Sequence, residues 1–165
     1  MPLRLPPSAS ETAKRFTIWL IAYKPVTARI IMLSPDLCTE EEVRTLVHAF
    51  YAKVRKDDVL GPIFNGQVHD WDEHLVTLTS FWSSILRGVG TYTGTPMQKH
   101  AAMPHLDESL FQRWLSLFLE TTREQPNEAM GHRAYTTAQR IAQSLWYSWQ
   151  LKNEPGSLPK DLRLN

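Results

Sequence analysis

Four side chains that can donate hydrogen bonds or bind a metal lie in apolar or irregular surroundings. Tyr51, His74 and Trp114 fall on the apolar faces of three predicted helices, and His100 lies in a long connection between two of them. Hydroxyl, imidazole and indole groups donate hydrogen bonds, and a neutral imidazole also binds metals. When each residue is taken alone, ordinary core packing is the favoured explanation. Their interest is that they occur together, and periodicity does not show whether they converge.

The composition narrows the chemistry that a metal or nucleotide could supply. Cys38 is the single cysteine, which excludes an internal disulfide and any cysteine-based zinc or iron–sulfur cage. Because there are six histidines, imidazole is the favoured ligand if a metal is bound. The sequence contains no glycine-rich nucleotide loop, no zinc-peptidase motif and no serine-hydrolase motif. The spacing from Glu128 to His132 is one residue too long for a di-iron bundle.

Length and charge favour one soluble domain. The chain has 165 residues, and its 18 basic and 17 acidic side chains give a net charge of +1, which does not favour nucleic acid as a partner. No apolar run reaches the roughly 20 residues that a membrane span needs. The nearest is residues 16–23, which we interpret as a leader or as a segment packed on the domain. We expect a cytoplasmic protein.

Four amphipathic helices are predicted between residues 39 and 151. Apolar residues recur there at helical spacing, and no alternating strand pattern is found. Thr39 and Glu42 form a capping box before the first helix, which we expect to end at residues 57–62, where Asp-Asp and Gly-Pro occur. The other three helices are predicted from about Asp70 to Gly88, from Asp107 to about Gln125, and from about Asn127 to Leu151. The pattern predicts an all-α domain.

The remaining segments divide the chain into three parts. Residues 1–38 are predicted to be a poorly structured or loosely packed extension, 39–151 the domain, and 152–165 a tail that reads as a linker and then a loose end. Inside the domain, residues 88–106 show little helical spacing of apolar residues. Only a short helix over residues 97–103 is expected there, after Pro96. A connection of this length in a small helical domain is usually functional or disordered.

Five stretches of the domain, in the right order and spacing, resemble the group III truncated haemoglobins. The resemblance spans about residues 39–151. It implies an all-α, globin-like fold, a truncated two-over-two helical sandwich. The matching stretches are Phe50–Asp57 with Leu60–Asn65, Trp71–His74 with Phe81-Trp82, Gly88–Tyr92, Gly94–His100, and Phe111–Phe118.

The resemblance also implies a role for each matched residue. His100 would be the proximal ligand to the iron of haem b (iron protoporphyrin IX), and Met97 would precede it as the family's apolar residue. Tyr51 and His74 would face the distal side, and Trp114 would close it. The expected apolar contacts are Phe64, which would wedge against the porphyrin, and Leu78, Phe81 and Trp82, which would line or back the pocket.

Oxygen, nitric oxide and carbon monoxide are the diatomic ligands that the resemblance implies. Several donors in a dry pocket favour a polar bound ligand over a neutral one and slow its release. We therefore expect chemistry on oxygen, nitric oxide or peroxide, such as nitric oxide dioxygenase or peroxidase-like activity, rather than simple oxygen transport. A reductase is a candidate partner, and the chain is expected to be a monomer.

Two other readings of the same residues stay open. In the first, Tyr51, His74 and Trp114 are only core, and the chain is a cofactor-free helical interaction module. In the second, a non-haem metal is bound by four histidines, namely His69, His74, His100 and His105. His105 is otherwise expected to be exposed or near a haem propionate. A Soret band would distinguish the haem protein from both alternatives.

Overall fold

The computed structural model describes residues 36–89, 92–94 and 106–163, and this part of the chain contains helices and no strand. The all-α prediction is therefore confirmed. None of these described helices is both long and apolar enough to cross a membrane. The helices are α2 (Glu40–Lys56), α3 (Leu60–Gln67), α4 (Trp71–Leu86), α6 (Glu108–Arg123) and α7 (Glu128–Asn153).

Side chains of the predicted capping residues begin four of the helices. Thr39 accepts from the backbone N–H of Glu42 at 3.1 Å, and the Glu42 carboxylate accepts from the backbone N–H of Thr39 at 2.7 Å, which completes the capping box. Asp70, Asp107 and Asn127 cap α4, α6 and α7 in the same manner, each accepting from the backbone N–H three residues on. The four predicted helix starts are confirmed.

Helix α3 was not predicted, because Gly61-Pro62 was expected to end a helix and instead lies in the first turn of one. A proline is tolerated there, since the first backbone N–H groups of a helix have no partner within it. The glycine is needed because a Cβ at position 61 would lie 2.8 Å from the carbonyl oxygen of Arg55 in α2. The same dipeptide therefore packs a short helix tightly against the end of α2.

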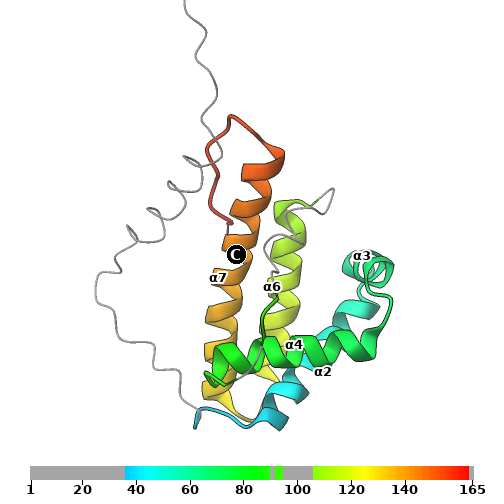
Figure 1. Cartoon of the computed structure of the whole chain (residues 1–165), viewed down its shortest axis with the longest axis vertical. Helices are drawn as coiled ribbons and strands as arrows, with labels where there is room; N and C mark the ends of the chain where they lie inside the picture. Colours follow the sequence, from blue (N-terminus) through cyan, green and yellow to red (C-terminus); the bar gives the residue numbers. More distant parts are fainter. Residues whose placement is uncertain (1–35, 90–91, 95–105, 164–165) are drawn as a thin grey trace, which may run out of the picture. The chain divides into compact units, whose positions relative to one another are not determined.

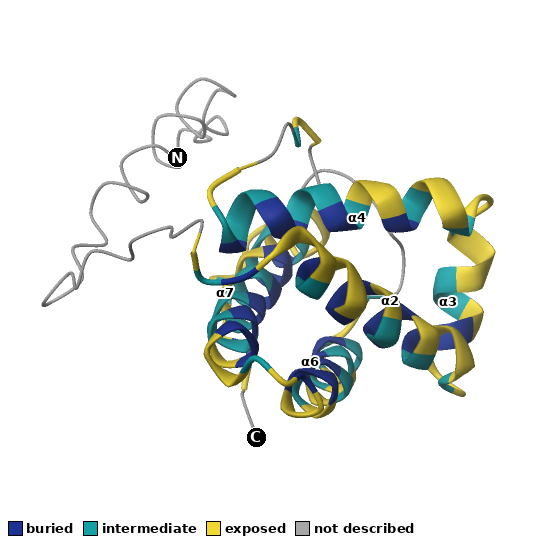
Figure 2. Ribbon diagram, turned by 90° about the horizontal axis from the view of Figure 1, so that it is seen from below, coloured by how far each residue is buried: buried dark blue, intermediate teal, exposed yellow. Residues whose placement is uncertain are grey.

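The helices form two pairs that pack across each other. Helix α2 lies on α4, α6 lies on α7, and α2 also packs on α6. Figure 1 shows α6 and α7 side by side, with α2 and α4 lying across them. This is the two-over-two arrangement that the family resemblance implies. The buried residues of each helix face the other helices in Figure 2. Helix α7 approaches α6 closely at Gly131, where a Cβ would lie only 2.7 Å from the Thr122 carbonyl oxygen.

Residues 157–163, here called the C-terminal segment, do not form the expected loose end. Leu162 is only 4% exposed, so its side chain belongs to the core. Its backbone N–H donates to Oε1 of Gln143 at 2.9 Å, and the backbone of Lys160 exchanges two hydrogen bonds with the Gln150 side chain. The side-chain amides of Gln143 and Gln150 on α7 thus supply hydrogen-bond partners to backbone groups that lie outside any helix or sheet.

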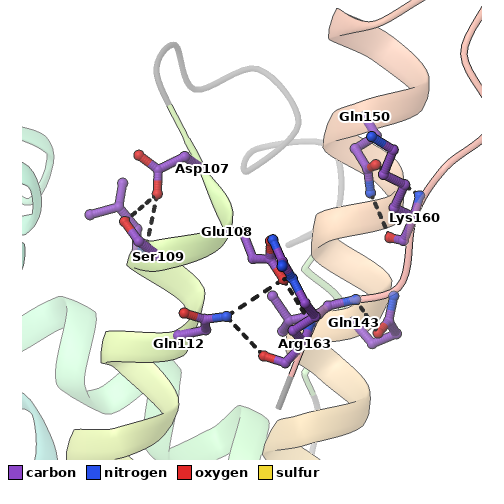
Figure 3. Close-up of polar contacts among 10 residues, drawn as sticks. Asp107, Glu108, Ser109, Gln112, Gln143, Gln150, Lys160 and Arg163 are labelled. Carbon is purple, nitrogen blue, oxygen red and sulfur yellow. Dashed lines mark hydrogen bonds and ion pairs between the residues drawn. The ribbon is translucent and has the colours of Figure 1, made fainter. Parts of the chain in front are cut away.

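The C-terminal segment is also tied to the start of α6. Arg163 donates to the Glu108 carboxylate through its backbone N–H at 2.8 Å and through its guanidinium at 3.0 Å. Its carbonyl oxygen accepts from the Gln112 side chain at 2.9 Å. Figure 3 shows these contacts beside those to Gln143 and Gln150. The segment therefore bridges α6 and α7.

Two residues of the predicted N-terminal extension are held on the domain. The carbonyl oxygen of Leu37 accepts from the Asn127 side chain at 3.0 Å, and that of Cys38 accepts from the Arg87 guanidinium at 3.2 Å. The Cys38 side chain is buried in the core. The structure of residues 1–35 lies outside the described residues, so the division of the chain into three parts stays a prediction.

Candidate functional site

Tyr51 is the centre of a group of aromatic side chains that comes from three helices. It lies on α2 and is only 5% exposed. Its ring centroid is 6.1 Å from that of Phe64 on α3, 6.1 Å from that of Trp71 on α4, and 6.2 Å from that of His74 on α4. Residues on separate helices therefore meet at Tyr51.

Trp114 brings a fourth helix, α6, to the same place. Its indole N–H, which can donate but not accept, acts on the Tyr51 hydroxyl as a hydrogen-bond donor that lowers the pKa of the phenol. Phe50 also contacts the Trp114 ring, with centroids 5.2 Å apart. We call Tyr51, Phe64, Trp71, His74 and Trp114 the tyrosine cluster.

Burial decides the protonation of the central phenol. Removal from water disfavours the anion and raises the pKa of Tyr51 far above its usual value, and the Trp114 hydrogen bond offsets this only partly. The phenol therefore keeps its proton at any physiological pH. Because its oxygen accepts from Trp114, the O–H proton remains available for a second acceptor.

The other predicted contacts of the haem differ in how far they are covered. Phe64, Leu78 and Phe81 are half-buried and lie against the core. Trp82 is buried and stacks on Phe118, with centroids 5.0 Å apart, so it backs this surface rather than lining it. Met97 and His100 lie outside the described residues. The roles assigned to all these residues stay predictions.

Two residues of this region were not assigned a role from the sequence. Trp71 contacts both Tyr51 and His74, with its centroid 6.1 Å from the first ring and 5.7 Å from the second, and the Arg55 guanidinium covers it at 4.7 Å. Its spacing three residues before His74 was the signal that could have found it. Phe118 stacks on Trp114 with centroids 5.3 Å apart, four residues along α6. Such spacing marks a shared helix face but not what that face contacts.

The non-haem metal reading finds no support within the part of the chain that the structure describes. No three His, Cys, Asp or Glu side chains are grouped there. His69 is exposed, and His74 packs against Tyr51 and Trp71 instead. The other two histidines of that reading, His100 and His105, lie outside the described residues.

A two-over-two helical sandwich that gathers a tyrosine, a histidine and a tryptophan defines a small globin-type domain. The chain matches the family model described as bacterial-like globin over residues 36–143, and it belongs to this family. Membership in a globin family supports haem-based ligand binding in general, with diatomic gases as the ligands.

Two similar proteins come from Campylobacter jejuni. The curated relative, group 3 truncated hemoglobin ctb, is 38% identical over 111 residues, which are 65% of this chain and 87% of the relative. The crystal structure of a group III truncated hemoglobin from this organism matches with a TM-score of 0.64 and 35% identity, covering 73% of this chain and 96% of the other. The resemblance seen in the sequence is thus confirmed.

Proposed function

We propose that the chain binds haem b through His100 and that Tyr51, His74 and Trp114 form the distal side of the pocket. The observation that carries the proposal is the convergence of these three polar side chains from α2, α4 and α6. The ligands would be oxygen, nitric oxide and carbon monoxide. Haem supplies the iron at which such a ligand binds.

The described residues fit a flat apolar group beside a polar ligand. Phe64, Leu78 and Phe81 are apolar side chains that the chain leaves half-buried, which suits contact with a porphyrin. Tyr51, whose ring lies 6.1 Å from that of Phe64, and Trp114 are donors of the kind that a polar diatomic ligand requires.

The tyrosine and the tryptophan have separate tasks in this proposal. The Trp114 N–H holds the phenol oxygen of Tyr51, so the phenol O–H is oriented before a ligand arrives. A donor that is already oriented in a buried site stabilises a partly negative ligand atom more than a donor in water does. Ligand release is therefore slow, which favours reaction over transport.

The proposed reactions are nitric oxide dioxygenation and peroxide reduction. A ligand that leaves the haem slowly stays available to a second reactant, and this supports catalysis rather than oxygen delivery. Both reactions take electrons from outside the chain, so a reductase is the proposed partner. Slow release of oxygen is the property that separates this proposal from a carrier.

The deciding experiment is an absorption spectrum of the purified chain with haemin. We expect a Soret band at about one haem per chain, and ferrous spectra that change with oxygen, carbon monoxide and nitric oxide. His100→Ala should abolish or scramble the band. The matched control is His132→Ala, because His132 is exposed on α7 and should leave the spectrum unchanged.

Two outcomes would contradict the proposal. A stable, colourless chain that takes up no haemin would favour the cofactor-free helical module. Zinc or iron bound without a porphyrin would favour the non-haem metal site.

A further inference from the structure

Asp57 lies where three helices meet. It is the residue that ends α2, and its backbone N–H donates to the carbonyl oxygens of Lys53 and Val54 at 3.0 and 3.2 Å. Its carboxylate accepts from the backbone N–H groups of Val59 and Leu60 at 3.0 and 2.9 Å, where α3 begins. One residue therefore ends one helix and starts the next.

The third helix is joined to Asp57 through Arg113 on α6. The Arg113 Nε lies 2.7 and 2.9 Å from the two carboxylate oxygens. The Asp57 side chain is only 6% exposed, so this ion pair is partly shielded from water and salt. Every polar group of Asp57 is used, since its carbonyl oxygen also accepts from the N–H of Gly61.

The three helices that meet at Asp57 also carry three members of the tyrosine cluster. Tyr51 lies six residues before it on α2, and Phe64 lies seven residues after it on α3. Trp114 directly follows Arg113 on α6. The pair of Asp57 and Arg113 therefore fixes the relative position of the helices that hold the phenol, the apolar ring and the indole donor.

We propose that Asp57 and Arg113 are positioning residues that set the hydrogen bond from Trp114 to Tyr51 and thereby the rate of ligand release. They touch no ligand and act through the α2 end, the α3 start and α6. The proposal rests on the proposed function, because ligand release presupposes a bound haem. A hydrogen bond weakens steeply as its distance or angle departs from the ideal. A small shift of α6 against α2 therefore weakens the hydrogen bond that Trp114 donates to Tyr51.

The chain provides a matched control in a second ion pair between the same two helices. Lys53 on α2 lies 2.5 Å from the Glu120 carboxylate and 2.7 Å from that of Glu124 on α6. Both acids are largely exposed, and they lie six and ten residues after Trp114 in the sequence. If α2–α6 ion pairs mattered only for general stability, losing Lys53 would resemble losing Arg113.

The experiment compares Asp57→Asn and Arg113→Gln with Lys53→Met in the full chain loaded with haem. Oxygen release is measured by stopped flow, and solvent exchange of the Trp114 indole N–H is measured by NMR. We expect oxygen release and indole exchange to quicken about fivefold or more in the first two variants and less than about twofold in Lys53→Met. Arg113→Lys, which keeps the charge and one donor, should recover part of the effect.

Each outcome decides one question. If Asp57→Asn and Arg113→Gln behave as Lys53→Met does, the inference is wrong, although the haem proposal stands. If the chain takes up no haem, the proposed function fails, and indole exchange in the chain as purified still tests the positioning of Trp114. If Asp57→Asn does not fold, Arg113→Gln carries the comparison, because Arg113 is half exposed and caps no helix.

Discussion

The tyrosine cluster and the C-terminal segment are built in opposite ways. The first joins four helices through tilted and edge-on rings and a hydrogen bond between the Trp114 and Tyr51 side chains. The second has no helix and is held by hydrogen bonds, with Leu162 as its only buried side chain. Burial of apolar area stabilises by roughly 25 cal/mol per Å², whereas an exposed hydrogen bond contributes little net free energy. The core around the cluster should therefore dominate stability.

One arginine–carboxylate pair joins α6 to the end of α2 near the tyrosine cluster, another joins α6 to the C-terminal segment, and the two pairs differ in exposure. In the pair of Arg113 and Asp57 the carboxylate is buried. In the pair of Arg163 and Glu108 the guanidinium is 83% exposed. Screening by water and salt is stronger for the second pair. The same chemistry should thus give unequal effects at these two positions of α6.

The largest effect is expected from Phe118→Ala. This ring is fully buried and contacts Phe50, Trp82 and Trp114, so its removal leaves a cavity between α2, α4 and α6. We expect a loss of about 3–5 kcal/mol in the free energy of unfolding, measured by urea denaturation. Val76→Ala, at an exposed position of α4, is the control and should cost under about 0.5 kcal/mol. Equal losses in both variants would overturn the ranking.

The next effect concerns ligand release. Tyr51→Phe removes the phenol donor and leaves the Trp114 N–H without its acceptor. Losing one such donor costs about 1–3 kcal/mol, so oxygen should leave the haem-loaded chain about 5- to 150-fold faster in stopped flow. Tyr147→Phe makes the same deletion in the other region, where the phenol binds Asp161. Release from that variant should match the unmodified chain, and a similar acceleration in both would refute the assignment.

A pH series should separate the two carboxylates. The Arg113 hydrogen bond lowers the pKa of Asp57 to about 2, from an ordinary value of 3.8. A depressed pKa contributes stability that is fully present above the ordinary value and is lost as the pH falls through about 2. The difference in unfolding free energy between the unmodified chain and Asp57→Asn should therefore shrink between about pH 4 and pH 2.

Glu108→Gln is the comparison within that series. Arg163 also lowers the pKa of Glu108, but this pair is far more exposed to water. Its stability difference should be smaller at every pH. A gap for Asp57→Asn that is constant from neutral to acid pH would show that the ion pair contributes nothing through its charge.

The smallest effect is expected from Arg163→Ala. The variant removes the exposed guanidinium but keeps the backbone contacts of residue 163 with Glu108 and Gln112. We expect a loss below about 1 kcal/mol in urea denaturation. A loss as large as that of Phe118→Ala would mean that the C-terminal segment, and not the aromatic core, limits stability.

The sequence predicted the regular part of the molecule because the signals there are local. Helix starts at Thr39, Asp70, Asp107 and Asn127 each depend on a side chain within three residues of the helix. Tyr51 and Trp114 were found on apolar faces by their spacing. The family resemblance then supplied the pairing of these faces, which periodicity alone leaves open.

Other features were missed because they depend on contacts between elements, and the spacing within one element does not report these. By local rules Gly61-Pro62 indicates a helix end. Its close contact with Arg55 and the hydrogen bond from the Leu60 N–H to Asp57 place it instead at a helix start. Residues 157–163 have the composition of a loose tail. Their position depends on Gln143, Gln150 and Glu108, whose side chains have no local signature for that task.

By itself the sequence determined the class of fold, the main helix boundaries and which polar side chains share an apolar face. Only the tertiary structure decided that Trp114 donates to Tyr51 and that Asp57 joins three helices. The physical reason is that periodicity reports how one helix divides its surface between core and water. Which side chains meet across helices depends on interhelical distance and angle, and these arise only when the whole core packs.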